Sequence, residues 1–83
     1  MIHIGHDNYL NEGLVAVILQ PDSSHAKRVR SMADEAGRLV NATSGHRVRS
    51  VIVLVTGQVV LSALKAATVK ERIMKIGRVD GRF

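Results

Sequence analysis

Apolar residues occur along this chain as short uninterrupted runs separated by polar segments. Residues 14–19 form such a run, LVAVIL, which ends at Gln20 and Pro21. A continuous apolar run of this length bounded by proline is typical of a buried strand. A shorter apolar-flanked segment, IHI at residues 2–4, predicts another strand before it.

Helical spacing begins after the proline. Asp22, Ser23 and Ser24 offer N-cap side chains, and Gly37 suits the position after a helix end, where a left-handed conformation is needed. At 100° per residue, five small or apolar residues between these limits share one face. They are Ala26, Val29, Met32, Ala33 and Ala36. We therefore predict an amphipathic helix.

The second half of the chain predicts three strands joined by turns. The strands are expected at residues 38–43, 47–55 and 58–64, with turns at residues 44–46 and 56–57. In this order they predict a three-stranded antiparallel meander.

A short second helix is expected next, because Val69, Ile73 and Ile76 repeat at helical spacing and Gly77 can stop the helix. The expected fold is α+β, in the order β-β-α-β-β-β-α. Residues 1–76 would form one domain and residues 77–83 a basic, mobile tail.

The run VIVLV at residues 51–55 does not alternate, so both faces of its strand should lie against apolar partners. The first helix covers one face. The second helix is one candidate cover for the other face, and a neighbouring subunit is the alternative that we favour. A chain of 83 residues with two aromatic residues and no cysteine has a small core. Heterologous subunit contacts close into rings when the rotation permits and otherwise grow into filaments, so a homo-oligomer is expected and both forms stay open here.

The chain is basic, with 12 Lys and Arg against 7 Asp and Glu. Most of the excess lies from Lys65 onward, where the basic end either keeps the protein soluble or contacts phosphate. The sequence shows no signal peptide and no apolar stretch of membrane-spanning length. We expect a cytoplasmic protein without a membrane partner.

Several blocks in one order resemble the RemA family of bacterial extracellular-matrix regulators. They are IGHDN, QPDSSHAKR, AGRLVNATSGHRVRSVIV and VVLSALKAATVKERI, within residues 4–73. The resemblance implies a small α+β subunit that assembles into a ring and binds duplex DNA as a transcriptional regulator of biofilm matrix genes. It also places Lys27 and Arg28 at the family's Lys-Arg pair and residues 45–49 at its basic loop.

The chemistry of that loop agrees with phosphate binding. Arg47 and Arg49 lie two apart on a predicted strand, so both project from one face while Val48 turns away. Guanidinium groups bind phosphate oxygens in a bidentate manner. The alternative is that either arginine forms an ion pair with Asp34 or Glu35 of a neighbouring subunit.

The helix cations are less certain contacts than the loop arginines. Lys27 and Arg28 point about 100° apart on a helix, so one of them could serve packing or a subunit contact. Arg30 can pair with Asp34 four residues later, which lowers its availability for DNA.

Two positions depart from the family pattern. His46 stands where the family has the first arginine of its Arg-Arg pair, and Leu14 where members often carry another arginine. Histidine is mostly neutral at cellular pH, so His46 offers DNA a hydrogen bond rather than a full charge. These departures either retune DNA binding or disable it, and the basic tail could compensate for the lost charge.

Other chemistry is disfavoured. The HIGH segment at residues 3–6 matches a motif of class I aminoacyl-tRNA synthetases, but this chain is far too short for their nucleotide-binding domain. His3, His6 and His25 show no metal-ligand spacing, and we predict no metal and no cofactor. No nucleophile is spaced to pair with a base, so we predict no enzyme. Single-stranded nucleic acid usually needs aromatic stacking residues, which are nearly absent.

Two functions remain in competition. The first is an oligomeric regulator that binds duplex DNA through His46, Arg47, Arg49, Lys27 and Arg28. The second is an assembly module with the same fold that binds a protein partner and has lost DNA binding. The salt dependence of DNA binding separates them.

Overall fold

The computed structural model describes residues 1–80 of the chain, and the side chains of residues 1–75. It forms a small α+β domain with two sheets and two α-helices, α1 and α2. The elements are β1 (Ile2–His3), β2 (Tyr9–Leu10), the 3₁₀ helix η1 (Glu12–Leu14), β3 (Val15–Leu19), α1 (Ser24–Glu35), β4 (Leu39–Asn41), β5 (Ser50–Leu54), β6 (Val59–Ser62) and α2 (Ala66–Asp80).

The main sheet has the order β3-β5-β6-β4, so the predicted meander is wrong. β5 and β6 form the expected antiparallel hairpin around the turn at residues 56–57. β4, however, pairs with β6 and runs parallel to it, with Val40 opposite Val60. The chain from β4 to β5 therefore crosses the end of β6 instead of turning back as a hairpin. The turn residues at 44–46 do not determine which strand β4 pairs with. The sequence pattern therefore predicted the strands but not their order in the sheet.

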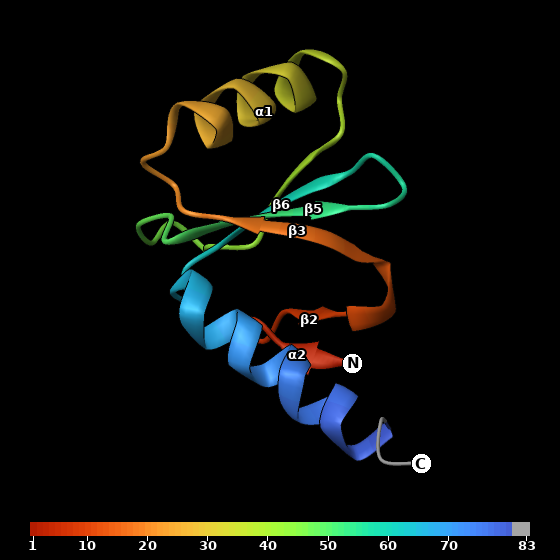
Figure 1. Ribbon diagram of the computed structural model, residues 1–83. Helices are drawn as coiled ribbons and strands as arrows, with labels where there is room; N and C mark the ends of the chain where they lie inside the picture. The colour runs from red at the N-terminus through yellow and green to blue at the C-terminus, as the bar shows by residue number, and fades with distance from the viewer. Residues whose placement is uncertain (81–83) are drawn as a thin grey trace.

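Two layers cover the main sheet. Figure 1 shows α1 above one face, with α2 and the β1–β2 hairpin below the other. The hairpin is tied to the sheet because the Ser62 hydroxyl donates a hydrogen bond to the Ile4 carbonyl at 2.8 Å. Strand β2 was not expected from the sequence, because its two residues carry no periodicity.

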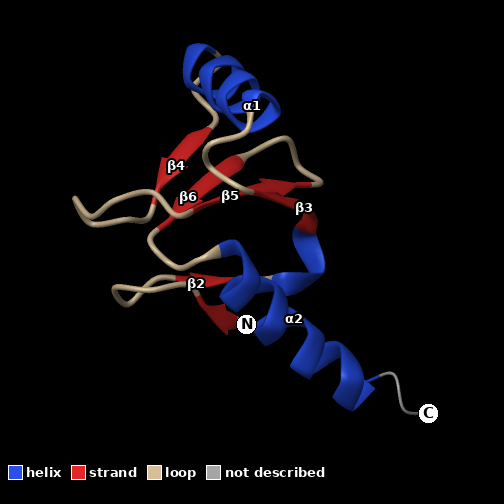
Figure 2. Cartoon of the chain, turned by 60° about the vertical axis from the view of Figure 1, so that its left-hand side comes forward, coloured by secondary structure: helices blue, strands red, loops and turns tan. Residues whose placement is uncertain are grey.

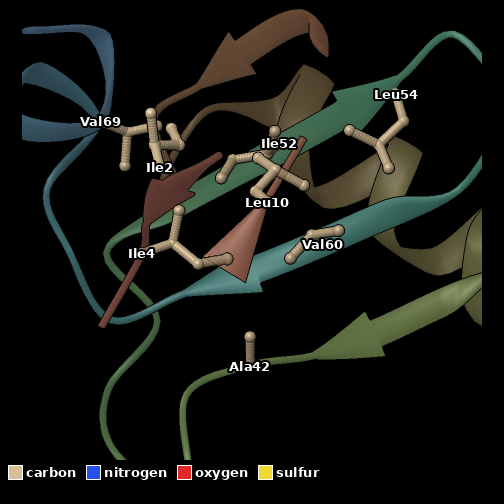
Figure 3. Close-up of a cluster of buried hydrophobic side chains, with 8 residues drawn as sticks. All are labelled: Ile2, Ile4, Leu10, Ala42, Ile52, Leu54, Val60 and Val69. Carbon is tan, nitrogen blue, oxygen red and sulfur yellow. The ribbon is translucent and has the colours of Figure 1, made fainter. Parts of the chain in front are cut away.

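The core consists of two clusters, one on each side of the sheet. The larger cluster, drawn in Figure 3, comprises Ile2, Ile4, Leu10, Ala42, Ile52, Leu54, Val60 and Val69. The second lies beneath α1 and comprises Ala26, Ala33, Val51, Val59 and Leu61.

Strand β5 is buried on both faces, as predicted, but its cover comes from within the subunit. Val51 belongs to the cluster under α1, and Ile52 belongs to the cluster shared with α2 and the hairpin. Both side chains are 0% exposed. The expectation that a neighbouring subunit covers β5 is therefore wrong, because the β1–β2 hairpin and α2 fill that role.

Strand β3 is also different from the prediction. It lies at an edge of the sheet, where Ala16 and Val17 are exposed, and its pairing with β5 is irregular between Val15 and Val17. An apolar run by itself does not distinguish an edge strand from a central one.

Helix α1 begins and ends at the capping residues that the sequence predicts, whereas α2 does not end at its predicted glycine. The Ser23 hydroxyl accepts a hydrogen bond from the Ala26 amide at 3.0 Å, and Gly37, at φ +71°, follows the end of α1. Met32, expected on the buried face, is 62% exposed. Helix α2 buries Val69 and partly buries Ile73, but it continues through Gly77 to Asp80. Gly77 therefore does not stop it. The Ile76 side chain and the end of the predicted tail, residues 81–83, lie outside the described residues.

In the described part of the chain, neither helix is long and apolar enough to cross a membrane.

Candidate nucleic-acid interface

The connection from β4 to β5, residues 42–49, carries three of the five predicted contact residues. It is a loop, so the predicted placement of Arg47 and Arg49 on a strand at a hairpin tip is wrong. The loop is nonetheless fixed at both ends. The Thr43 hydroxyl donates to Asn41 Oδ1 at 2.6 Å, and the Arg49 amide donates to the Ser62 carbonyl at 2.8 Å. These two hydrogen bonds hold the loop backbone at its ends.

A tight turn at Ser44 and Gly45 sets the direction of the basic segment, residues 46–49. Ser44 and Gly45 lie in the left-handed region, with φ +52° and +83°, and the His46 amide donates to the Thr43 carbonyl at 3.0 Å. A non-glycine residue with positive φ is uncommon and tends to occur at functional sites. The tight turn sends residues 46–49 back across the end of β6.

Arg47 and Arg49 line the same groove, although they are not on a strand. The groove has a volume of about 330 Å³ and opens to solvent. Its wall consists of Gln20, Pro21, Asp22, Arg47, Val48, Arg49, Lys65, Ala66 and Ala67. The partly buried Val48 packs on the cluster beneath α1, which fixes the segment between the two arginines. The two arginines therefore share a groove, and Val48 is part of the same wall.

Neither arginine has an internal counter-ion. Both side chains are exposed, and neither guanidinium forms an ion pair or side-chain hydrogen bond with a described residue. The one ion pair in the described part joins the N-terminal ammonium to Glu12 at 3.0 Å. A backbone hydrogen bond and this ammonium lower the pKa of Glu12. Because neither guanidinium has such a partner among the described residues, Arg47 and Arg49 are available to an external anion.

His46 contacts His6, a residue to which the sequence pattern assigns no functional role. Its ring stacks on that of His6, with centroids 4.1 Å apart and planes 11° from parallel. His6 lies in the β1–β2 turn, at φ +51°. Figure 2 shows this turn and the β4–β5 loop on the same side of the molecule. Spacing in the sequence gives no sign that residues 40 positions apart meet, so His6 could not have been found from it.

A single side chain joins those two loops. Asn8 Nδ2 donates to the carbonyl oxygens of Gly5 at 3.1 Å, His6 at 3.2 Å and Ala42 at 3.0 Å. The amide thus connects the β1–β2 turn to the start of the β4–β5 loop. It thereby holds together the two loops that carry the stacked histidines.

The predicted helix contacts lie elsewhere. Lys27 and Arg28 are exposed near the start of α1, and neither lines the arginine groove. Lys27 instead borders a separate shallow hollow with Arg30, Ser31, Asp34 and Leu39. The expected ion pair between Arg30 and Asp34 is not formed in the described residues. The structure thus places Arg47 and Arg49 in one groove. His46 lies on the same loop but does not line that groove, and neither do Lys27 and Arg28.

Lys65 is the groove residue that sequence analysis did not single out. The sequence indicates it only as the first residue of the basic end, whereas the structure places it in the wall of the arginine groove, immediately before α2. Its position immediately before a helix was the available signal.

The remaining histidine near this region is structural. His3 stacks edge-on against Tyr9 at 5.1 Å, and its carbonyl accepts a hydrogen bond from Arg72 Nη1 at 2.7 Å. Arg72 therefore ties α2 to β1, although its charge was counted with the basic end. Among the described residues, no group of three or more His, Asp or Glu side chains is arranged to hold a metal ion.

Comparison with known proteins agrees with the resemblance read from the sequence. Residues 1–73 match the RemA-like model, described as extracellular matrix regulatory protein A-like. A protein of Thermodesulfovibrio yellowstonii, named as a candidate regulatory protein, is 34% identical over 96% of this chain and 94% of its own. Relatives named in the same way from Synechococcus sp. (strain JA-3-3Ab) and Lachnoclostridium phytofermentans are 43% and 37% identical, over 93% and 88% of this chain and 89% and 80% of theirs. The chain belongs to the RemA-like family.

Proposed function

We propose that the protein is an oligomeric transcription regulator that acts in the cytoplasm and binds duplex DNA, as the resemblance to regulators of biofilm matrix genes implies. One observation carries the proposal. Arg47 and Arg49, both exposed and without an ion pair to a described residue, line one groove on a loop that is hydrogen-bonded at both ends. Two guanidinium groups so placed can bind the oxygens of neighbouring backbone phosphates.

This mode of binding depends on charge more than on base sequence. Phosphate contacts fix the position of a protein on the duplex but carry no base code, so selectivity would come from DNA shape and the spacing of subunits. Duplex binding needs no aromatic platform, which suits a chain whose only aromatic residues are one Tyr and one Phe.

Self-association would multiply these contacts. Each sheet edge exposes an apolar side chain, Val17 on β3 at 44% and Val40 on β4 at 43%. An exposed strand edge is a template for pairing with another chain. Contact between the β3 edge of one subunit and the β4 edge of the next would be heterologous, as closure into a ring requires.

The test is DNA binding as a function of salt, with Arg47→Ala and Arg49→Ala compared with Arg38→Ala. Arg38 precedes β4 and its guanidinium approaches Gly57 in the β5–β6 turn, at the other end of the strands. Fluorescence anisotropy with a duplex of about 100 base pairs measures affinity, and light scattering measures mass. For about six to ten phosphate contacts, affinity should fall roughly 10³- to 10⁵-fold between 50 and 200 mM salt.

We expect Arg47→Ala and Arg49→Ala to abolish binding while the oligomer stays intact, and Arg38→Ala to bind as the unchanged protein does. An oligomer that ignores DNA at every salt concentration would support the assembly module instead. If Arg47→Ala or Arg49→Ala dissociates the oligomer, that arginine serves a subunit contact and its DNA role is wrong.

A further inference from the structure

The first turn of α2 begins in the arginine groove with an unusual residue at its N-cap. Lys65 holds this position, because its carbonyl accepts hydrogen bonds from the amides of Thr68 at 2.9 Å and Val69 at 3.1 Å. Ser, Thr, Asp and Asn are preferred there, because their side chains accept hydrogen bonds from the first amides. A lysine has no acceptor, and its charge opposes the positive end of the helix dipole.

The first backbone amides of α2 have no side-chain acceptor among the described residues. Neither the Ala66 nor the Ala67 amide donates a hydrogen bond to a described residue, and the first turn contains no acidic side chain. Helix α1 provides the contrast, since the Ser23 hydroxyl accepts from the Ala26 amide at 3.0 Å. Free amides at a helix start are satisfied by side chains, water or a ligand.

Three cationic residues from two segments line the same groove. Arg47 and Arg49 come from the β4–β5 loop, and Lys65 stands beside Ala66 and Ala67 on the α2 side. Asp22 is the one acidic residue of the groove wall, and it forms no ion pair with the three cations. Cations that line one groove without a counter-ion give that groove a positive potential, which favours a bound anion.

We propose that this groove binds one phosphate group, held by Arg47, Arg49 and Lys65 together with the Ala66 and Ala67 amides. The inference rests on the proposed function, in which that phosphate belongs to the DNA backbone. It adds Lys65 and the start of α2 to the interface. The geometry would suit the phosphate of a small molecule equally, and the experiment separates the two sources.

The experiment uses the full chain with ¹⁵N-labelled alanine, titrated with a duplex and, separately, with inorganic phosphate. We expect the Ala66 and Ala67 amide resonances to shift with either probe. Lys65→Gln should abolish these shifts and weaken duplex binding about tenfold, as expected for a charge-assisted hydrogen bond. The salt slope should fall by about 0.9 for each subunit in contact. Lys75→Gln, an exposed lysine later on the same helix, is the matched control and should change neither.

A second variant separates phosphate binding from a structural role of Lys65. Lys65→Asp places a preferred N-cap residue at the start of α2, so its carboxylate should accept from the free amides and raise the melting temperature. The same carboxylate would occupy the phosphate site and repel an anion. We expect Lys65→Asp to be more stable and to bind neither inorganic phosphate nor duplex DNA. A merely structural residue would not move these two properties in opposite directions.

The outcomes distinguish this inference from the proposed function. If the duplex binds but the Ala66 and Ala67 resonances stay in place and Lys65→Gln behaves as Lys75→Gln does, the phosphate site is wrong and DNA binding stands. If inorganic phosphate shifts both resonances but the duplex never binds, the groove is a phosphate site for a small molecule and the DNA function is wrong.

Discussion

Val48 determines what its two neighbours can do. It packs on the cluster beneath α1, so the arginines on either side of it remain exposed and line one groove. Next to them, His46 stacks on His6 where the family pattern predicts a third cation. At the scale of the residue, the loop therefore presents two exposed arginines beside a histidine whose ring is stacked on another.

Replacing that neighbour tests whether charge limits DNA binding. His46→Arg should strengthen duplex binding and steepen the salt slope by about 0.9 for each subunit in contact, because it adds a phosphate contact beside Arg47. Fluorescence anisotropy over a salt series measures both. His25→Arg, at an exposed site on α1, adds the same charge away from the loop and should have a smaller effect. Weaker binding by His46→Arg would instead mean that the stack with His6 is needed to present the loop.

The site residues differ in how far the sequence could predict them. Arg47 and Arg49 are predicted from the alternation around Val48. Both line one groove, although they do not lie on a strand. His6 and Lys65 were missed because their roles come from contacts between segments. Nothing near His6 in the sequence indicates the stack on His46. Nothing near Lys65 indicates the groove that the β4–β5 loop completes.

At the scale of the element, apolar runs indicated where strands form but not how they are arranged. β5 was predicted as doubly buried and is so, whereas the similar run in β3 lies at a sheet edge with Val17 exposed. The position of β4 beside β6 depends on the path of the chain after α1, which no local pattern records. Gly37 follows the end of α1, yet Gly77 lies within α2, because a glycine inside a helix costs only about 1 kcal/mol.

The link between the β1–β2 turn and the β4–β5 loop gives a prediction at this scale. Asn8→Ala removes a side-chain amide that donates to three carbonyl oxygens, including that of Ala42 at 3.0 Å. We expect the free energy of unfolding to fall by about 1–3 kcal/mol, because partly buried acceptors lose their donor. Urea denaturation measures the loss.

Asn8→Asp sharpens this test, since a carboxylate keeps the size of the side chain but cannot donate. It should be at least as destabilising as Asn8→Ala near neutral pH. DNA binding should weaken in both variants, because the loop that carries Arg47 is no longer held to the turn. A stability equal to that of the unchanged protein in both variants would show that the two loops are held by packing alone.

At the scale of the molecule, the subunit covers both faces of β5 by itself. An uncovered β5 is therefore no longer a reason to expect a neighbouring subunit. Self-association is instead favoured by the two sheet edges, where β3 and β4 each expose an apolar side chain. It would also multiply the weak phosphate contacts of the proposed function. Linked binding sites gain avidity without any new contact at each site. Assembly and DNA affinity should therefore rise and fall together.

Val17→Lys tests that coupling. Lysine on an exposed edge strand opposes pairing with another chain, while its long side chain tolerates the half-exposed position, so the subunit should stay folded. We expect light scattering to show a smaller assembly and anisotropy to show weaker duplex binding, even though the variant adds a positive charge. Val55→Lys makes the same exchange in the β5–β6 turn, at a side chain that is 66% exposed, and should leave mass and binding unchanged.

If Val55→Lys dissociates the assembly and Val17→Lys does not, the subunits meet at that turn and the β3 edge is free. If Val17→Lys becomes monomeric but keeps its full DNA affinity, the groove arginines bind DNA without help from neighbouring subunits, and avidity has no part in the mechanism.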